Sequence, residues 1–457
     1  METKQEAFYK TVIRIALPVT LQSLLQSSFS VVDQVMIGQL GSKSIAGIGL
    51  GGKFASMYSV VLGAVAAAAG ILISQYIGKK EEREVSRSFF RNLGLAVVLA
   101  LIFMAACLFF ADPIMEIYTK EKETVQLAGE YLSLLAFSFL PMAVSTIVTT
   151  LLRCLDAAVF PLYASIAAVI LNTGLNYLLI FGKLGMPQLG VPGAALATVI
   201  SQYISCVLIL LFGVWYVRKQ KGHEMLRFSV MKKRISLRDI TGENRRQYLE
   251  ILGPILVCEF VWSLGENVYA GIYGNIGTDA CAAMTLTAPI QGLMIGALSG
   301  LSQAAGILIG KSLGSGERKK AYQDSRKLML YGLSGALVLS LLLVIFRRAY
   351  VQIYQVEPQV RAAACEILLV FAVFSPVKVE NMILGGGIIR SGGRTKYVMW
   401  IDLIGTWLFG VPFGMLAAFV WKWQVPYVYL MLSLEECVRL GISLVLFRKK
   451  TWMIRIK

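Results

Sequence analysis

The chain has 457 residues, of which 56% are hydrophobic and only 16% are charged. Soluble domains carry about 25% charged residues, so this composition excludes an ordinary soluble enzyme or binding domain. The formal net charge of +17 does not indicate nucleic acid as a partner, because most basic residues lie in loops between apolar runs, as in membrane proteins. The seven cysteines are scattered and His223 is the single histidine, so neither a zinc site nor a disulfide framework is expected, and Na⁺ is the only candidate metal ion.

Apolar runs of about 20 or more residues predict membrane-spanning α-helices. The stretch 93–110 is apolar on all sides and lacks the two-residue alternation of a β-barrel strand. The predicted fold class is therefore an all-α polytopic membrane protein. In chain order, the twelve predicted transmembrane helices are 12–38, 46–75, 89–111, 126–151, 158–182, 191–216, 248–273, 279–309, 324–347, 360–388, 396–420 and 424–448.

Lysine and arginine residues are concentrated in alternate loops, and this asymmetry sets the expected orientation. The segment 217–247 holds ten basic and three acidic residues, and 76–91, 310–323 and the residues after 448 are also basic. Both chain ends are therefore expected in the cytoplasm. The polar start of the chain, followed by a long helix, predicts no cleaved signal peptide.

The sequence repeats itself at an offset of 236 in the numbering. Pro18 corresponds to Pro254, and the motif GILI at 70–73 returns at 306–309. Six helices fit into one repeat, so both halves enter the membrane from the same side, which predicts two parallel six-helix repeats around a central cavity. Pro18 and Pro254 interrupt the first helix of each half and are hinge candidates, with kinks that only shape packing as an equal alternative.

Further along the chain the offset becomes 237, where Arg153 corresponds to Arg390. The repeat divides the chain into two lobes joined by a basic loop. The expected parts are an N-lobe with helices one to six at 1–216, a basic cytoplasmic linker at 217–247, and a C-lobe with helices seven to twelve at 248–457.

Polar side chains follow one face of the first predicted helix. Gln22, Gln26, Ser30 and Asp33 are spaced i, i+4, i+8 and i+11, which places them on one helical face. A charged side chain near the bilayer centre costs roughly 2.5–3.5 kcal/mol, so Asp33 is a candidate for binding the coupling cation or proton. The other three are candidates for a polar stripe in the substrate cavity. The alternative is that Asp33 makes an interhelical hydrogen bond or faces a wet vestibule.

The fifth and sixth predicted helices carry polar residues at a similar depth. Asn172 and Asn176 are four residues apart and share a face, and Thr198 follows on the next helix. Carboxylate, amide and hydroxyl oxygens are suitable ligands for a small hard cation. Together with Asp33, these residues form the predicted coupling site for Na⁺ or H⁺.

The second half contains its own charged cluster. Glu259, Ser263 and Glu266 share one face of the seventh predicted helix, and Glu380 lies at a comparable depth on the tenth. Carboxylates that share a cavity repel each other and favour uptake of a proton or cation. Lys378 leaves a second interpretation open, in which it neutralises Glu259 in a structural ion pair. The other intramembrane acids are expected in ion pairs: Asp402 with Arg394 or Lys396, and Glu435 or Glu436 with Arg439.

Three stretches carry a family resemblance. They are IALPVTLQSLLQSSFSVVDQVMIGQLG near the start, the region 151–202 that begins LLRCLDAAVFPLY, and GGGIIRSGGRTKYVMWIDLIGTWLFGVPFG at 385–414. Together they resemble the multidrug and toxic compound extrusion (MATE) family of the MOP flippase superfamily. The resemblance implies an alternating-access exporter that exchanges Na⁺ or H⁺ for amphipathic, often cationic, organic compounds.

The resemblance also bears on the candidate sites. In archaeal and several bacterial members, an acid on helix one pairs with an Asn-x-x-x-Asp motif on helix five and a threonine on helix six. This sequence has Asn176 in place of the aspartate, which argues against a relay of two carboxylates. NorM-like members place a sodium site on helices seven and ten, which here carry Glu259 and Glu380.

The predicted function is secondary active efflux of amphipathic, cationic drugs in exchange for Na⁺ or H⁺. One charge crossing 100 mV supplies about 2.3 kcal/mol, and the sequence has no GxxxxGK[ST] nucleotide-binding motif. We expect no enzymatic activity, no cofactor, drug-like molecules and the lipid bilayer as partners, a monomer, and a location in the bacterial cytoplasmic membrane. The alternative is a flippase for a lipid-linked precursor, which would be expected to have a strongly cationic cavity.

Overall fold

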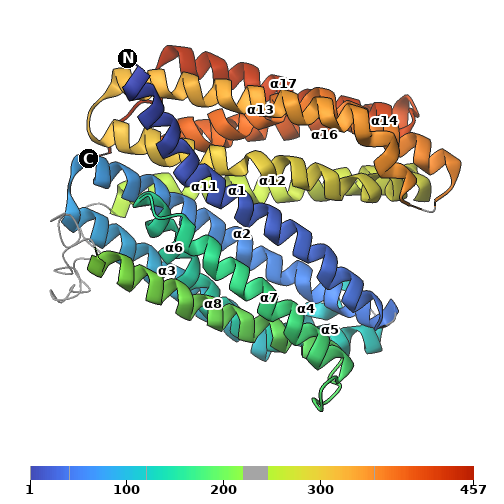
Figure 1. The fold of residues 1–457 in the computed structure, drawn as a ribbon. Helices are drawn as coiled ribbons and strands as arrows, with labels where there is room; N and C mark the ends of the chain where they lie inside the picture. The colour runs from blue at the N-terminus through green and yellow to red at the C-terminus, as the bar shows by residue number, and fades with distance from the viewer. Residues whose placement is uncertain (1, 41, 120, 220–244, 355, 457) are drawn as a thin grey trace. The chain divides into compact units, whose positions relative to one another are not determined.

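The computed structural model describes residues 2–40, 42–119, 121–219, 245–354 and 356–456, and the regular elements within them are helices (Figure 1). The first half holds α1 (Glu2–Gly38), α2 (Ser42–Lys79), α3 (Glu82–Phe109), α4 (Ala111–Tyr118), α5 (Lys122–Leu135), η1 (Ala136–Ser138), α6 (Phe139–Cys154), α7 (Val159–Phe181) and α8 (Val191–Lys219). The second half holds α11 (Arg245–Ile276), α12 (Thr278–Gly314), α13 (Arg318–Gln352), α14 (Pro358–Asn381), η3 (Met382–Ile389), α15 (Thr395–Asp402), η4 (Leu403–Gly410), α16 (Val411–Met415), η5 (Leu416–Val420) and α17 (Val425–Lys449).

Contiguous elements join into long helical segments that match the twelve predicted spans. The elements α5, η1 and α6 form one segment, α14 continues into η3, and α15 continues through η5. In the described part of the chain, ten segments are long and apolar enough to cross a membrane. The other two are α1, which carries the glutamine and serine stripe, and α17, whose middle holds Glu435, Glu436 and Arg439. Charged side chains in its middle lower the hydropathy of α17, and the side chains of part of α1 lie outside the described residues.

The chain forms two compact units. Unit 1 comprises Met1–Thr20, Ser74–Lys79 and Asn244–Lys457, and unit 2 comprises Leu21–Ile73 and Lys80–Glu243. The start of α1 and the end of α2 therefore pack with the second half of the chain. The expected lobe boundaries stay predictions, and most of the expected linker at 217–247 lies outside the described residues.

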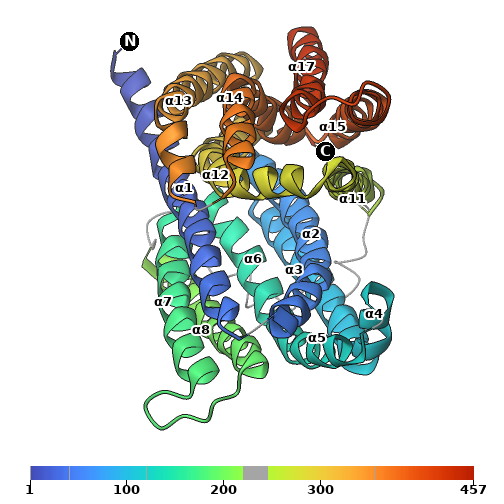
Figure 2. The same cartoon turned by 90° about the vertical axis from the view of Figure 1, so that its right-hand side faces the viewer.

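Within each unit, the same pairs of repeat-related helices pack against each other. In unit 2, α3 packs against α6 and α7 packs against α8. In unit 1, their counterparts do the same: α13 packs against α14, and the segment from α15 to η5 packs against α17 (Figure 2). This shared packing confirms the internal repeat that the offset of 236 predicted.

π-Helical turns distinguish unit 1 from its counterpart. The elements η3, η4 and η5 are π-helical, whereas α6 and α7 are regular α-helices. A π turn holds more residues than an α turn, so it can absorb an inserted residue without breaking the helix. The repeat offset grows by one between Gly314 and Arg390, and Arg390 directly follows η3. We infer that η3 contains the extra residue.

Apolar side chains form the interior of each unit and also much of its outer surface. In unit 1, Leu368 and Phe371 of α14 are buried against neighbouring helices. On α13, Leu341, Ile345 and Phe346 are each at least 60% exposed. A helix that is apolar on both its packed and its open face is suited to lipid as its solvent.

The two repeat-related prolines lie inside continuous helices. Pro18 is buried within α1 and Pro254 is buried within α11. Each proline removes one backbone donor from its helix, and the helix continues on both sides. Bending at these positions during transport stays a prediction.

Candidate functional site

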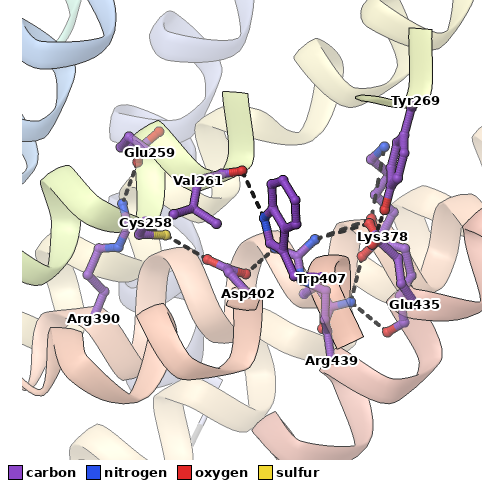
Figure 3. Close-up of polar contacts among 12 residues, drawn as sticks. Cys258, Glu259, Val261, Tyr269, Lys378, Arg390, Asp402, Trp407, Glu435 and Arg439 are labelled. Carbon is purple, nitrogen blue, oxygen red and sulfur yellow. Dashed lines mark hydrogen bonds and ion pairs between the residues drawn. The ribbon is translucent and has the colours of Figure 1, made fainter. Parts of the chain in front are cut away.

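A chain of polar contacts begins on α11 in unit 1. Glu259 forms an ion pair with Arg390, with 3.3 Å between Oε1 and Nη1. Nη2 of Arg390 also donates to Sγ of Cys258 at 3.7 Å, and the Cys258 thiol donates to Oδ2 of Asp402 at 2.7 Å. These contacts connect α11, the residue after η3, and the last residue of α15 (Figure 3).

Arg439 of α17 continues this chain of contacts. Its guanidinium forms a short ion pair with Asp402 and lies 3.9 Å from Glu435 and 3.6 Å from Glu436. The Tyr269 hydroxyl of α11 donates a short hydrogen bond to Glu435. Glu435, Glu436 and Arg439 come together because they lie within about one helical turn of each other. One guanidinium therefore faces three carboxylates.

The far end of the contacts lies on α14. The Lys378 ammonium is 3.9 Å from Oε1 of Glu436, and the Asn381 side-chain amide donates to both the backbone oxygen and Oε2 of Glu436 at 2.8 Å. The Lys378 side chain is 43% exposed and that of Glu436 is 8% exposed, so the lysine end of the network is the more open one. We call this set the unit 1 network; its members are Cys258, Glu259, Tyr269, Lys378, Asn381, Arg390, Asp402, Glu435, Glu436 and Arg439.

The unit 1 network contains one more acidic than basic side chain. Its acidic side chains are Glu259, Asp402, Glu435 and Glu436, and its basic side chains are Lys378, Arg390 and Arg439. Burial disfavours an uncompensated charge, so the network has a physical reason to take up one further cation or proton.

The structure separates the acids that the sequence grouped on helices seven and ten. Glu259 is paired with Arg390, Glu266 is exposed, and Glu380 is buried against Gly332 of α13. Oε1 of Glu380 has no hydrogen-bond partner among the described residues. The expectation that Lys378 neutralises Glu259 is wrong, because Lys378 contacts Glu436 instead.

The two ion-pair expectations for the remaining acids have different outcomes. Arg439 pairs with Glu435 and Glu436, as helical spacing predicted. The expected partners of Asp402 were wrong. Arg394 lies over the ring of Tyr397, and Asp402 is paired with Arg439 on another helix. Asp402 ends α15 with its side chain directed into the unit, so it meets residues of the neighbouring helices.

Unit 2 contains a neutral counterpart of the Arg390 contacts. Nη2 of Arg153 donates to Oε1 of Gln22 at 2.7 Å, and the Gln22 amide donates to Ser165 at 2.7 Å. The offset of 236 in the first helix of each half and of 237 further on relates three pairs of residues, which are Gln22 and Cys258, Arg153 and Arg390, and Ser165 and Asp402. In both units the arginine thus donates to a neutral residue that donates in turn to the next helix. In unit 1, Asp402 takes the place of Ser165, and Glu259, Glu435 and Glu436 add further carboxylates to this shared arrangement.

The polar residues predicted on helices five and six are in contact. The Asn172 amide donates to Thr198 Oγ1 at 3.3 Å and to Ser201 Oγ at 3.4 Å, and the Asn176 amide donates to Asn172 Oδ1 at 3.2 Å. Thr198 donates to the carbonyl of Ala194. The three predicted residues therefore form one hydrogen-bonded cluster, and its role in binding an ion stays a prediction.

The stripe on helix one is described only in part. Gln22 makes the contacts with Arg153 and Ser165, and Gln26 is exposed. Ser30 and Asp33 lie on α1, and their side chains fall outside the described part of the chain. Their predicted places in the stripe and in the coupling site stay predictions.

Replacing Asn172 by leucine is expected to destabilise unit 2. The substitution removes the donor to Thr198 and Ser201 and the acceptor for Asn176, and the loss of these hydrogen bonds should cost about 1–3 kcal/mol. Thermal unfolding in detergent measures the change. Asn275→Leu is the control, because Asn275 is exposed and its side-chain amide donates to Gly271 of the same helix. Equal stability of Asn172→Leu and the unmodified protein would show that the cluster does not contribute to folding.

Comparison with known proteins identifies the family. The MatE family model matches residues 18–178 and again 254–416, which together are more than half of the chain. The chain belongs to the MatE family. The two matched regions start at 18 and 254, the positions of the repeat-related prolines, so each repeat contains one copy of the family's unit. The twelve-helix, two-repeat membrane fold and the MATE resemblance are both confirmed.

Named relatives and solved structures agree with this assignment. The chain is 24% identical to the probable multidrug resistance protein NorM of Thermotoga maritima over 404 residues, covering 88% of this chain and 84% of the relative. It is 27% identical to the multidrug resistance protein NorM of Burkholderia vietnamiensis over 412 residues, covering 89% and 86%. A solved MOP superfamily transporter from Pyrococcus furiosus has the same fold, with a TM-score of 0.84 at 17% identity over 96% of this chain and 95% of that chain.

Sequence reasoning for this MatE protein missed the connections around Cys258, Arg390 and Asp402. The repeat offset already related Arg390 to Arg153, so a signal was present in the sequence. The same arginine recurs in both repeats. This recurrence predicts that each arginine has a hydrogen-bonding partner at a corresponding place in its repeat. The identity of that partner needed the packing of α11 against α15.

Proposed function

We propose that this MatE protein is a multidrug efflux transporter of the bacterial cytoplasmic membrane that acts as a monomer. It exports amphipathic, cationic organic compounds in exchange for Na⁺ or H⁺ by alternating access. The named NorM relatives support the efflux activity. The exchange of a cation for a cation is supported by the charges of the unit 1 network.

The single observation that carries the proposal is the excess carboxylate in the unit 1 network. Four acidic and three basic side chains are held inside long helices of a membrane-spanning fold. A buried group of this kind is stabilised by one additional positive charge. A proton entering down its gradient can supply that charge, and its release can be coupled to the binding of a cationic substrate.

Glu259 is the carboxylate best placed to exchange partners. Its side chain is 30% exposed, more than any other acid of the network, and among the described residues it has one guanidinium partner, Arg390, at 3.3 Å. A cation that binds Glu259 therefore competes with Arg390. Arg390 would remain bonded to Cys258, which lies within 3.7 Å of the same guanidinium. Glu380 is a second proton acceptor, because its buried carboxyl lacks a partner at Oε1.

Na⁺ would draw on amide and hydroxyl oxygens in unit 2. Within the described residues, no group of three or more His, Cys, Asp or Glu side chains is placed to hold a metal ion. Asn172, Asn176 and Thr198 are already in contact and offer oxygen ligands of the type that hard cations prefer. With Asp33 as the anionic ligand predicted from the sequence, they make the proposed Na⁺ site.

A lipid-linked precursor flippase would need the opposite charge balance. Such a transporter is expected to bind a pyrophosphate headgroup with an excess of basic side chains. In the unit 1 network, each of Lys378, Arg390 and Arg439 faces at least one carboxylate. The charges therefore favour a cationic over an anionic substrate.

Transport into proteoliposomes tests the proposed function. Purified protein is reconstituted, and uptake of a fluorescent organic cation is recorded with a sodium gradient and a proton gradient imposed separately. We expect one gradient to drive uptake and Asp33→Asn to reduce it at least tenfold. If no gradient drives transport across a broad panel of cations, antiport is wrong. If Asp33→Asn transports normally at every sodium concentration and pH, the proposed unit 2 site is wrong.

A further inference from the structure

The segment that follows α17 folds back into unit 1. We call residues 451–456 the strap. Lys450 adopts a left-handed backbone conformation with φ of 58°, which turns the chain at the end of α17. Trp452 in the strap is fully buried and stacks on Phe447 with ring centroids 5.8 Å apart, and Phe447 stacks on Tyr322 of α13 at 4.8 Å. The strap is therefore anchored by an aromatic stack.

One buried glutamine joins the strap to α2. Gln75 is 0% exposed, and its Nε2 donates to the carbonyl oxygens of Ser391 at 2.7 Å and Ile454 at 3.2 Å. Its Oε1 accepts from the backbone N–H of Ile456 at 2.8 Å. Gln75 thus connects α2, the turn after η3 and two residues of the strap. Its amide group is fully used, since both N–H groups and the oxygen have partners.

The end of α2 lies directly on the end of α12. A Cβ atom at Gly78 would collide with the carbonyl oxygen of Lys311, and a Cβ atom at Gly314 would collide with the carbonyl oxygen of Gln75. The two contacts are equivalent under the repeat, because the offset of 236 relates Gly78 to Gly314 and Gln75 to Lys311. Close backbone contact of this kind requires glycine on both helices.

The strap meets α2 at the place where that helix changes its packing. The part of α2 up to Ile73 belongs to unit 2, and Ser74–Lys79 belongs to unit 1. Ser74 is fully buried beside Gly310 of α12. Gln75 is therefore the second residue of the part of α2 that packs within unit 1.

We propose that the strap is a latch that holds the end of α2 on α12, with Gln75 as its catch. This inference rests on the proposed function, in which alternating access requires helices of the first sequence repeat, such as α2, to separate periodically from helices of the second, such as α12. The catch is made of hydrogen bonds, which can be exchanged for bonds to water when the end of α2 lifts away. An apolar residue at 75 could fill the same space, but it could not specify the position of the strap backbone.

Two measurements on the full-length protein in lipid nanodiscs test the latch. The first is the rate at which a maleimide modifies a cysteine at the buried position 74, introduced as Ser74→Cys and quantified by mass spectrometry on its own peptide. The second is amide hydrogen exchange in the strap. We expect Gln75→Leu to raise both rates about tenfold, the change expected when one or two hydrogen bonds are lost.

A second variant and a control make the result specific. Trp452→Ala releases the strap at its other anchor and is expected to raise both rates, and the double variant should react no faster than the faster single variant. Gln291→Leu is the control, because it makes the same replacement on α12, where Gln291 accepts from Tyr429 and does not touch the strap. Neither rate should change in this control.

Three outcomes would overturn the latch. In the first, Gln75→Leu raises the rate of amide hydrogen exchange in the strap but leaves the rate of maleimide modification at position 74 unchanged, so the strap does not hold α2. In the second, the effects of the two variants add. In the third, Gln291→Leu raises both rates equally, which would indicate general loosening. None of these measurements requires transport, so failure of the latch is distinguishable from failure of the proposed function.

Discussion

Replacing Arg439 by methionine is expected to lower the free energy of unfolding by about 3–5 kcal/mol, the cost of removing one partner from a buried ion pair. Arg439 is 15% exposed and faces Asp402, Glu435 and Glu436. Without it, three carboxylates remain close together with Lys378 as the only other described cation at that end of the network. Thermal and denaturant unfolding in detergent, with the fraction of folded protein after expression, measures the loss.

A control variant and a double variant distinguish the effect of burial from the effect of removing one positive charge. Lys320→Met is the control, because it removes the cation of an exposed pair with Glu317, 3.0 Å apart, and should cost less than about 1 kcal/mol. Adding Glu436→Gln to Arg439→Met should restore part of the stability, since it removes one of the repelling charges. If Arg439→Met is as stable as the unmodified protein, the carboxylates are already neutral and the charge count of the network is wrong.

The fold could be predicted from sequence because hydropathy and the repeat are both local or periodic signals. The predicted spans 191–216 and 424–448 differ from α8 (Val191–Lys219) and α17 (Val425–Lys449) by three residues or fewer. The first span was predicted to start at 12, whereas α1 starts at Glu2. Helices can continue beyond the apolar core of a bilayer, and hydropathy does not register that continuation.

Within the unit 1 network, contacts could be predicted only where the partners share a helix. The pairing of Arg439 with Glu435 and Glu436 follows from i, i+4 and i, i+3 spacing. Lys378 and Glu380 are two residues apart, which places them on nearly opposite faces of α14. Lys378 therefore meets Glu436 on α17, while Glu380 lies against α13.

Partners on different helices required the three-dimensional arrangement. Glu259 and Arg390 are 131 residues apart, and Cys258 and Asp402 are 144 apart. Neither separation has a period that a single sequence reveals. The π-helical turns of η3 further change the face on which Arg390 emerges, and nothing in the glycine-rich stretch before it predicts a π rather than an α turn.

The second large effect is expected from Glu259→Gln. We expect gradient-driven uptake of organic cations in proteoliposomes to fall at least tenfold. The free energy of unfolding should change by about 1 kcal/mol or less, which is the contribution of one hydrogen bond. The fold should survive because the repeat-related arginine of unit 2 is held by a neutral amide: Arg153 bonds to Gln22 at 2.7 Å. Glutamine at 259 would offer Arg390 an acceptor of the same kind. It would remove the negative charge for which Arg390 and an entering cation compete.

This substitution distinguishes a coupling carboxylate from a structural one. If Glu259 only positions Arg390, the glutamine variant retains a hydrogen-bond acceptor and transports normally, which would contradict the proposed competition. Glu250→Gln is the matched control on the same helix, because Glu250 pairs with Arg246 in an exposed position. It should transport like the unmodified protein.

Unit 2 allows the reciprocal experiment, Gln22→Glu, which places a carboxylate beside Arg153. We expect that adding Gln22→Glu to the Glu259→Gln variant does not restore transport. The carboxylate at 22 would contact Ser165, the neutral counterpart of Asp402, so the arginine of unit 2 still lacks the contacts that continue from Arg390 through Asp402. Restored transport would show that either unit can carry the coupling charge. If the double variant still fails to transport, an arginine paired with a carboxylate is insufficient, and coupling depends on the whole unit 1 network.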